Sequence, residues 1–438
     1  MRRATLLVTG AVALTLAGRG EVLAAEGWLP FGLRGKVVLK NFSYFAEAPT
    51  DHRRFRDEGV FQLEWTRRFA PWIRVRVVGD AREDDAGLTR GVSFRIADTA
   101  RRRSVVNLTE AFAELGGGPV QLAVGKQVYA WGTADAYNPT DNINPYDYLD
   151  PIDHEKLGVY AAALHASGGP TSLTLVVIPA FTPSRVPLPS SRWAPAWPAG
   201  PVVVEDRQLP PARLDEVQFA ARARVTVRGW DVAVSYFDGF DDTPVIRRSS
   251  LEVAPLVVMP RLTPVFTRFR APGLDFSTTY RSFEFHGELA AKLVETSGAE
   301  DRLQGIFGLN YTWDAPVRGL EQITGGIEYA REESLAVVDP EVLRVRDALW
   351  AALPNDAFRN AVVGRVEVKF GEDTQLKLRG TADLTRTPSH YMQARVFHKL
   401  SDPLQLEAGF EVFGGRRETF WGRWDRNDRF FALLRYLF

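Results

Sequence analysis

The densest run of side chains that could do chemistry lies between residues 125 and 155. The run Gly125-Lys-Gln-Val-Tyr-Ala-Trp-Gly132 is followed by carboxylates and amides at short intervals. Such groups could narrow a pore or bind Ca²⁺ through carboxylate and carbonyl oxygens, although the spacing lacks the Gly and final Glu of an EF-hand loop. Asn, Asp and Pro are equally typical of a loop that only makes turns. No metal or cofactor is predicted, and the candidates for a pore constriction are Asp135, Asp141, Asn142, Asn144, Asp147, Asp150 and Asp153.

The charge of this stretch leads to an expectation about selectivity. If its carboxylates project into a water-filled lumen, their summed field should raise the local cation concentration. Replacing Asp141 and Asp147 with Asn should then lower cation preference, most clearly at low salt, where screening is weak. If the carboxylates lie in external water instead, the substitutions should have no effect.

Other catalytic and metal-binding patterns are weak. His286 stands between Glu284 and Glu288 with strand spacing, and a solvated salt-bridge ladder is the simpler interpretation of that trio. The sequence contains no G-x-S-x-G, P-loop or H-E-x-x-H motif. Because it has no cysteine, disulfides, iron–sulfur clusters and thiolate metal sites are excluded. We therefore predict a protein that is not an enzyme.

The same region resembles a known family. Asn107-Leu-Thr-Glu-Ala-Phe-Ala-Glu114, the run from Gly125 to Gly132, and Asn138-Pro-Thr-Asp141 are similar to alginate-export-type porins and related outer-membrane barrels. The match covers residues 108–160, and elsewhere only the general barrel pattern supports it. The resemblance implies a large monomeric barrel whose Arg-rich lumen passes an acidic polysaccharide. Because residues 131–155 are acidic here, the substrate is not assigned.

Period-2 alternation of apolar and polar residues runs through almost the whole chain and predicts strands. About 18 strands can be placed, with 16 possible. One of them is expected between Leu251 and Arg270, where three prolines weaken the pattern. One helix is expected at 340–353. The expected fold is all-β: a single transmembrane antiparallel β-barrel over residues 26–438, with long extracellular loops and short periplasmic turns.

A barrel in a membrane must be apolar outside and can be polar inside. The polar faces of the predicted strands therefore supply the lumen. The lumen-facing candidates are Arg74, Arg76, Arg222, Arg224, Glu284, His286, Glu288, Lys377 and Arg379.

Both ends of the chain agree with this fold. The last strand ends on Leu434, Tyr436 and Phe438 at alternate positions, which resembles the assembly signal of Gram-negative outer-membrane barrels. Residues 1–25 read as a signal peptide, since a basic start is followed by a short apolar run and then by small residues.

The lengths of the connections provide an independent check. In barrels of this class the termini usually lie in the periplasm, and the periplasmic turns are short. With 18 strands, the short connections near residues 70, 116, 168, 228, 315, 371 and 401 fall on one side. The long segments 131–155, 181–213, 332–356 and 415–427 fall on the other.

These observations predict an outer-membrane channel of a Gram-negative bacterium that passes an unknown small solute by diffusion through a charged lumen. Two alternatives remain: a structural or partner-binding barrel of an export or electron-transfer complex, and an alginate-like export porin. The expected partners are outer-membrane lipid, lipopolysaccharide and the barrel-assembly machinery. The 54 basic and 54 acidic side chains balance, which argues against nucleic acid as a partner.

Overall fold

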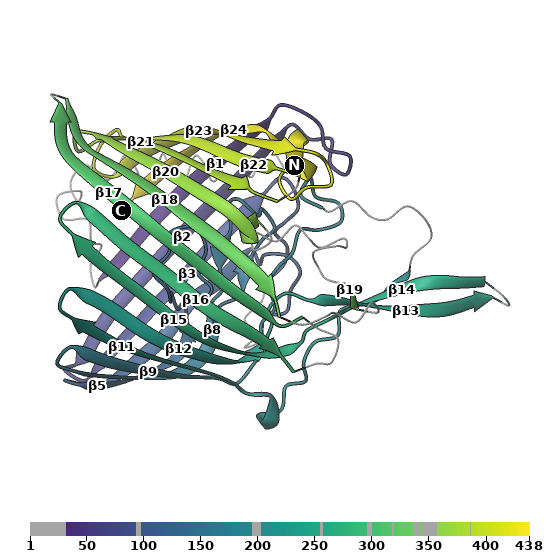
Figure 1. Ribbon diagram of the computed structural model, residues 1–438, viewed down its shortest axis with the longest axis horizontal. Coiled ribbons are helices and arrows are strands. Elements are labelled where there is room, and N and C mark those ends of the chain that lie inside the picture. Colours follow the sequence, from purple (N-terminus) through teal and green to yellow (C-terminus); the bar gives the residue numbers. More distant parts are fainter. Residues whose placement is uncertain are drawn as a thin grey trace.

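The chain folds into a closed barrel of 18 strands, as seen in a computed structural model (Figure 1). The structure describes residues 32–92, 98–194, 203–254, 257–295, 300–317, 319–335, 342–343, 357–385 and 387–438. Every pair of neighbouring barrel strands is antiparallel. The predicted fold class and the predicted strand number are confirmed.

The barrel strands of the first half are β1 (Leu33–Tyr44), β2 (Phe55–Ala70), β3 (Ile73–Asp84), β4 (Val106–Gly117), β5 (Val120–Gln127), β8 (Val159–Gly168), β9 (Thr171–Ile178), β11 (Gln218–Val227) and β12 (Trp230–Phe240). Those of the second half are β15 (Arg268–Tyr280), β16 (Phe283–Val294), β17 (Arg302–Val317), β18 (Leu320–Ser334), β20 (Asn360–Phe370), β21 (Thr374–Asp383), β22 (Ser389–Lys399), β23 (Leu404–Gly415) and β24 (Arg429–Leu437). The elements outside the barrel are β6 (Tyr146–Asp147), β7 (Glu155–Lys156), β10 (Val203–Val204), β13 (Val245–Ala254), β14 (Val257–Val265), β19 (Val342–Leu343) and the 3₁₀ helices η2 (Leu214–Glu216) and η4 (Gly422–Asn427).

The barrel closes where the first strand meets the last. β1 pairs with β24 from Lys36↔Leu437 to Tyr44↔Arg429. Phe438 extends this pairing by one residue, because the Gly35 amide donates to its carbonyl at 2.8 Å and its own amide donates back at 3.0 Å. A closed sheet has no free edge, so each of the 18 strands pairs with a neighbour on both sides.

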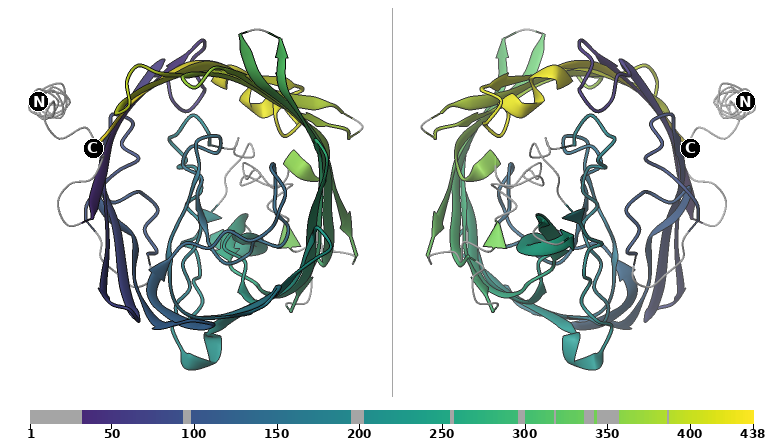
Figure 2. Two further views of the ribbon diagram at one scale, coloured as in Figure 1. Left: turned by 90° about the vertical axis from the view of Figure 1, so that its left-hand side faces the viewer. Right: turned by 90° about the vertical axis from the view of Figure 1, so that its right-hand side faces the viewer.

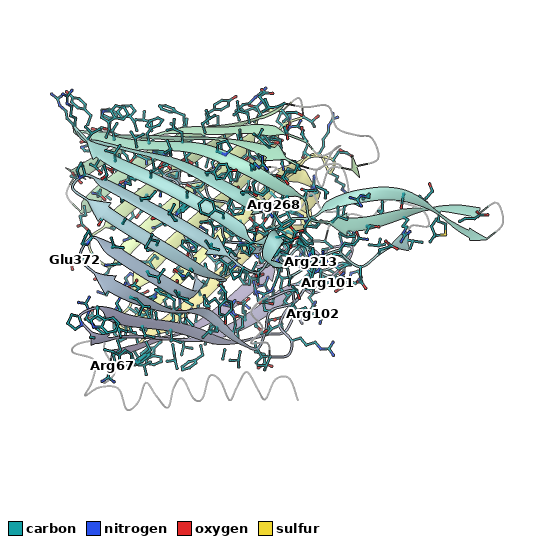
Figure 3. All side chains as sticks on the ribbon, turned by 90° about the horizontal axis from the view of Figure 1, so that it is seen from below. Arg67, Arg101, Arg102, Arg213, Arg268 and Glu372 are labelled. Atoms are coloured by element: carbon teal, nitrogen blue, oxygen red, sulfur yellow. The ribbon has the colours of Figure 1, made fainter. Side chains whose placement is uncertain are left out.

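The two ends of the barrel differ. Short turns at 71–72, 118–119, 169–170, 228–229, 281–282, 371–373 and 400–403 lie at one end, on the left in Figure 1. The long connections lie at the other end. Figure 3 shows charged side chains at both rims, with Arg67 and Glu372 at the short-turn rim and Arg101, Arg102 and Arg213 at the loop rim.

The outer face of the barrel is apolar. Exposed aliphatic and aromatic side chains stand on almost every strand between the rims, among them Val124, Leu164, Val234, Leu289, Phe307, Ile327, Leu378, Val396 and Leu434. Near the short turns the exposed residues are large aromatics: Phe69, Trp72, Trp230, Tyr280, Phe283, Trp313 and Phe370. Buried Asp, Glu, Arg and His side chains lie inside. An apolar belt edged by aromatic rings around a polar interior is the arrangement expected of a barrel in lipid.

One predicted strand is misplaced. The barrel strand expected between Leu251 and Arg270 is β15 (Arg268–Tyr280), and it contains Pro272 and Gly273. The residues before it form the hairpin β13–β14, which belongs to a separate four-stranded sheet with β10 and β19 and projects from the loop end (Figure 1). The prolines of the hairpin therefore indicated correctly that this stretch does not form a barrel strand. In contrast, the barrel strand β15 contains Pro272 in its interior.

Two further predictions concern residues that lie wholly or mostly outside the described part of the chain. The signal peptide expected at 1–25 lies outside the described residues, as does most of the helix expected at 340–353. Within that expected helix, Val342 and Leu343 are described, and they form strand β19. Among the described helices, none has both the length and the apolarity needed to cross a membrane.

Candidate functional site

Residues 128–158, which connect β5 to β8, fold back into the barrel, and we call them the infolded segment. Figure 2 shows connections, coloured blue and teal, that lie within the ring of strands rather than outside it. Buried residues of this segment include Trp131, Asn144 and Leu149. The Asn144 side chain fixes its two ends together, because it accepts from the Tyr129 amide at 2.6 Å and donates to the Leu157 carbonyl at 2.7 Å.

Two strand carboxylates hold the tip of the segment by its backbone. Glu288 accepts hydrogen bonds from the amides of Thr133 at 2.6 Å and Ala134 at 2.9 Å. Glu328 accepts from the amides of Asp135 at 2.7 Å and Ala136 at 2.9 Å. Charge-assisted bonds of this kind are stronger than neutral ones, so the two carboxylates clamp the turn against β16 and β18.

His286 supports this clamp. Its buried ring lies beside Glu328, with Nε2 at 2.7 Å from Oε1. Asp135, His286 and Glu328 bring three possible metal-ligand atoms within 4.8 Å of one another. Glu328 Oε1 also accepts from the Asp135 amide, and Asp135 Oδ2 pairs with Arg365 at 2.8 Å. His286 Nδ1, in contrast, is buried and has no hydrogen-bond partner among the described residues. The trio is thus a hydrogen-bonded clamp in which one ring nitrogen is left unpaired.

Farther along the segment, three carboxylates bind cations that project from the wall and from neighbouring loops. Asp147 accepts from Arg103 at 3.0 Å and Arg185 at 2.9 Å. Burial alone would raise the pKa of Asp147, but these two guanidinium groups lower it to about 2. The negative charge is therefore fixed and locally neutralised.

Asp150 and Asp153 make equivalent contacts with strands near the seam of the barrel, where β1 pairs with β24. Asp150 accepts from Arg56 at 2.8 Å and from Arg429 at 2.6 Å, and Asp153 accepts from Lys40 at 2.7 Å. Despite burial, the Arg429 and Arg56 charges hold the pKa of Asp150 well below its usual range. The segment is thus tied to β1, β2 and β24 by ion pairs.

A cavity of about 630 Å³ lies inside the barrel. The infolded segment forms one side of it through the rings of Tyr137, Tyr146, Tyr148 and His154. Strands β16–β18 and β20–β22 form much of the other side. A cavity of this size is typical of small-molecule sites.

Cations dominate the solvent-facing charge of β20–β22. Lys377 and Arg365 have side chains that are 47% and 39% exposed. Arg379 donates to the Tyr391 hydroxyl at 3.3 Å, and no described carboxylate lies within 4.0 Å of it. Two carboxylates of the cavity lining are also partly exposed: Glu367, which pairs with Lys377 at 3.2 Å, at 28%, and Asp135, which pairs with Arg365, at 34%. Others are more deeply buried, as with Asp241 at 9%. We call Arg365, Lys377, Arg379 and Arg395 the basic face.

The predicted constriction residues divide into two groups. Asp135, Asp141, Asn142 and Asn144 line the cavity. Asp147, Asp150 and Asp153 lie between the segment and the wall, paired with cations. Asp141 also pairs with Lys156. The expected cation preference assumed that these carboxylates are unpaired. Because several of them pair with cations, the expectation has less support. Whether the segment constricts a pore stays a prediction.

The nine predicted lumen residues all lie on strand faces that point inward. Glu284, His286 and Glu288 surround the tip of the segment, and Lys377 and Arg379 line the cavity. The four arginines of β3 and β11 instead form ion pairs along the wall with strand carboxylates: Arg74 with Glu114, Arg76 with Glu64 and Glu110, Arg222 with Asp275, and Arg224 with Asp231.

Several important residues were not singled out from the sequence. Glu328, Arg365 and Arg395 alternate with apolar neighbours on predicted strands, so the sequence could have predicted that they point inward. It could not have predicted their partners. Glu328 is 193 positions from Asp135 in the chain, and only the path of the infolded segment brings the two together.

Comparison with known proteins identifies the fold. No family model matches the chain, and the search of curated proteins found no match. Pseudomonas aeruginosa OccK11 (OpdR) has a TM-score of 0.50 and 13% identity, with 94% of this chain and 97% of that chain covered. Wzi, an Escherichia coli outer-membrane protein involved in group 1 capsule assembly and described as a carbohydrate-binding β-barrel, has a TM-score of 0.51 and 9% identity, with 97% and 87% covered.

The fold is that of outer-membrane porin-like barrels. A mutant Rhodopseudomonas blastica porin also matches, at a TM-score of 0.43 and 10% identity over 93% of this chain and 99% of that one. At such identities the likeness concerns the fold alone. The finer resemblance to alginate-export-type porins stays a prediction.

Asp242, a cavity-lining loop residue, gives the site a pH dependence. Burial and then the adjacent Asp241 carboxylate raise the pKa of Asp242 to about 7, although Ser184 donates to it at 2.7 Å. Between pH 4 and 7 the folded state then binds a proton that the unfolded state does not. The contribution of Asp242 to stability must fall as pH rises through this window.

We expect Asp242→Asn to remove this slope. Relative to the variant, the wild type should lose about 2–4 kcal/mol between pH 4 and 7 and nothing further above pH 8. Urea unfolding at a series of pH values measures the difference. Asp206→Asn, at a fully exposed side chain, is the control and should reproduce the wild-type slope. Parallel curves for wild type and Asp242→Asn would contradict the assignment.

Proposed function

We propose that this protein is a porin-like channel in the outer membrane of a Gram-negative bacterium. Small polar solutes pass by diffusion through the cavity between the infolded segment and the basic face, with a preference for anions. The observation that carries the proposal is the distribution of charge in the cavity. The cations of the basic face are partly exposed to water, whereas most of the carboxylates are more deeply buried, with Asp135 and Glu367 as the exceptions.

The surroundings of the cavity support this role. Ion pairs on both sides of the infolded segment position it within the barrel, so the passage has a fixed wall. Fixed solvent-facing charges in a narrow, low-dielectric passage focus the field and enrich ions of opposite sign. The apolar outer belt and the porin-like fold support residence in the outer membrane.

Planar-bilayer recording of the purified protein tests the proposal. In a tenfold salt gradient the reversal potential should have the sign of an anion-preferring pore. The double variant Lys377→Gln/Arg379→Gln removes two cations of the basic face, and the permeability ratio of anion to cation should fall by roughly twofold or more at low salt. The effect should shrink at 1 M salt, where the screening length is about 3 Å.

Arg67→Gln is the matched control, because Arg67 is exposed at the short-turn rim (Figure 3) and stacks on Phe69 outside the lumen. It should leave the reversal potential unchanged. A wild-type barrel that carries no current, or a double variant with wild-type selectivity, would overturn the proposal.

Two other functions have a specific observation in their favour. The projecting hairpin β13–β14 favours a partner-binding barrel, and electrical silence together with a co-purifying partner would support that role.

The basic face and the cavity rings would also suit an acidic polysaccharide, as the family resemblance implies. Current block by uronate oligosaccharides, but not by neutral dextran of equal size, would favour that substrate.

A further inference from the structure

A second, much smaller pocket lies where the infolded segment returns to the wall at strands β3–β5. Its volume is about 20 Å³. It is enclosed by strand side chains, by the loop that precedes β4, by the end of the infolded segment and by Arg185. The charged residues that line it are Arg82, Asp98, Arg103, Lys126, Asp147, Glu155, Lys156 and Arg185.

Lys126 is the charged side chain in the described lining of this pocket for which no ion pair or hydrogen bond is found. It is 7% exposed, and within the described part of the chain its ammonium group has no hydrogen bond and no carboxylate within 4.0 Å. Its stem crosses Gly158, where an added Cβ would lie 3.2 Å from Lys126 Cγ and 3.3 Å from Cε. The ammonium is therefore held in the pocket by the shape of its surroundings rather than by an ion pair.

The neighbouring carboxylates are already engaged by other cations. Asp147 serves both Arg103 and Arg185, and Glu155 pairs with Arg82 at 2.9 Å. Arg185 Nε is also a buried donor without an acceptor. The lining thus contains five cationic and three acidic side chains, and its donors exceed its acceptors.

The pocket volume determines the kind of ligand. A single water needs about 10–15 Å³ of such space, so this pocket holds one particle of that size. The Lys126 side chain is largely rather than completely buried, and an ammonium in such surroundings without a counter-charge is unfavourable. A monatomic anion supplies that charge within the available volume, whereas the four oxygens of phosphate or sulfate do not fit.

We propose that this pocket binds one chloride ion, held by Lys126 and the surrounding donors. The ion ties the return of the infolded segment to β3–β5 and to the loop that carries Arg185. It lies outside the cavity of the proposed channel, so the inference does not depend on conduction.

Halide-dependent stability tests the site in the intact, folded barrel. The sodium salt is held at constant total concentration while gluconate is replaced stepwise by chloride, and thermal unfolding is followed. Wild type should show a saturable rise of about 2 °C or more. Lys126→Met should abolish the rise, whereas Lys369→Met, which removes another lysine of the barrel wall, should retain it.

Crystals soaked in bromide give a direct second measurement that does not require the variant to fold. Anomalous scattering should show one peak in contact with Lys126 Nζ. Equal wild-type stability in the two salts, or wild-type crystals without a peak at this position, would overturn the proposal and leave water or a neutral lysine in the pocket. A peak that persists in Lys126→Met would also overturn it.

Discussion

Arg429→Met is expected to lower the free energy of unfolding by about 3–5 kcal/mol, because it removes one partner from a buried cluster of charges. Arg429 lies on β24 with 1% of its side chain exposed. It binds Asp150 of the infolded segment and Glu411 of β23, and its guanidinium lies 4.4 Å from the centre of the Phe42 ring. Methionine would retain most of the volume and none of the charge.

The loss should also alter the position of the infolded segment. Asp150 would keep Arg56 but lose its contact with the last strand, so the segment would be held less firmly at that side. In bilayer recordings we expect larger current fluctuations than in wild type. Urea unfolding followed by tryptophan fluorescence measures the stability, since the Trp193 ring lies 5.3 Å from the Arg429 guanidinium.

Two variants make the test specific. Arg435→Met removes an arginine from the inward face of the same strand, but that side chain is 30% exposed and bonds to Glu407 and Gln405. Its cost should stay within about 1 kcal/mol. Arg429→Met/Glu411→Gln should recover part of the loss, because it also removes a carboxylate that the first substitution leaves without its arginine. Equal losses for Arg429→Met and Arg435→Met would refute the role of the buried cluster.

The second large effect is expected at the seam of the barrel. The Phe438 ring covers Gly35, so an added Cβ at Gly35 would lie 2.2 Å from the ring Cζ. The same ring stacks on Phe61 and Tyr436, with centroids 6.0 and 6.2 Å away. Gly35→Ala should therefore displace the ring and weaken the pairing of β1 with β24.

Deletion of Phe438 should cost about 2–4 kcal/mol, because it removes a partly buried ring and two backbone hydrogen bonds. We further propose that the barrel-assembly machinery reads this terminal strand, so the deletion should leave unfolded precursor in the periplasm. The fraction that migrates as folded barrel on unheated SDS gels measures both effects.

Gly59→Ala is the matched control for the seam. It lies on β2, next to β1, but there an added Cβ would meet only Leu39 Cδ2 at 3.9 Å. Wild-type yield is expected. If Gly35→Ala and Gly59→Ala gave equal folded fractions, the ring contact would not be what secures closure.

The alternation of apolar and polar residues predicted most of the barrel, because this alternation is present within each strand. Phe61, Leu63 and Trp65 alternate with polar residues whatever lies beside them. The alternation did not predict β15, because Pro272 and Gly273 interrupt it there. This strand is stabilised by its pairing with β12 and β16. Local sequence contains no information about such neighbours.

The candidate site was less predictable for the same reason. The acidic infolded segment stood out by composition, but the partners of its carboxylates did not. Asp150 and Arg429 are separated by 279 positions, and their contact depends on barrel closure, strand register and the path of a long loop at once. An expectation about selectivity that assumed free carboxylates could not anticipate this neutralisation.

The backbone clamp at the tip of the infolded segment has a consequence for evolution. Glu288 and Glu328 hold amide groups, which every residue except proline provides. The side chains at Thr133, Ala134 and Ala136 can therefore diverge among descendants while the loop stays in place. Gly132 is the exception, because its φ of +97° is left-handed and an added Cβ would lie 2.4 Å from Glu288 Oε1. Single mutations at these three positions could thus change the side chains at the tip of the infolded segment while the fold of the segment is retained.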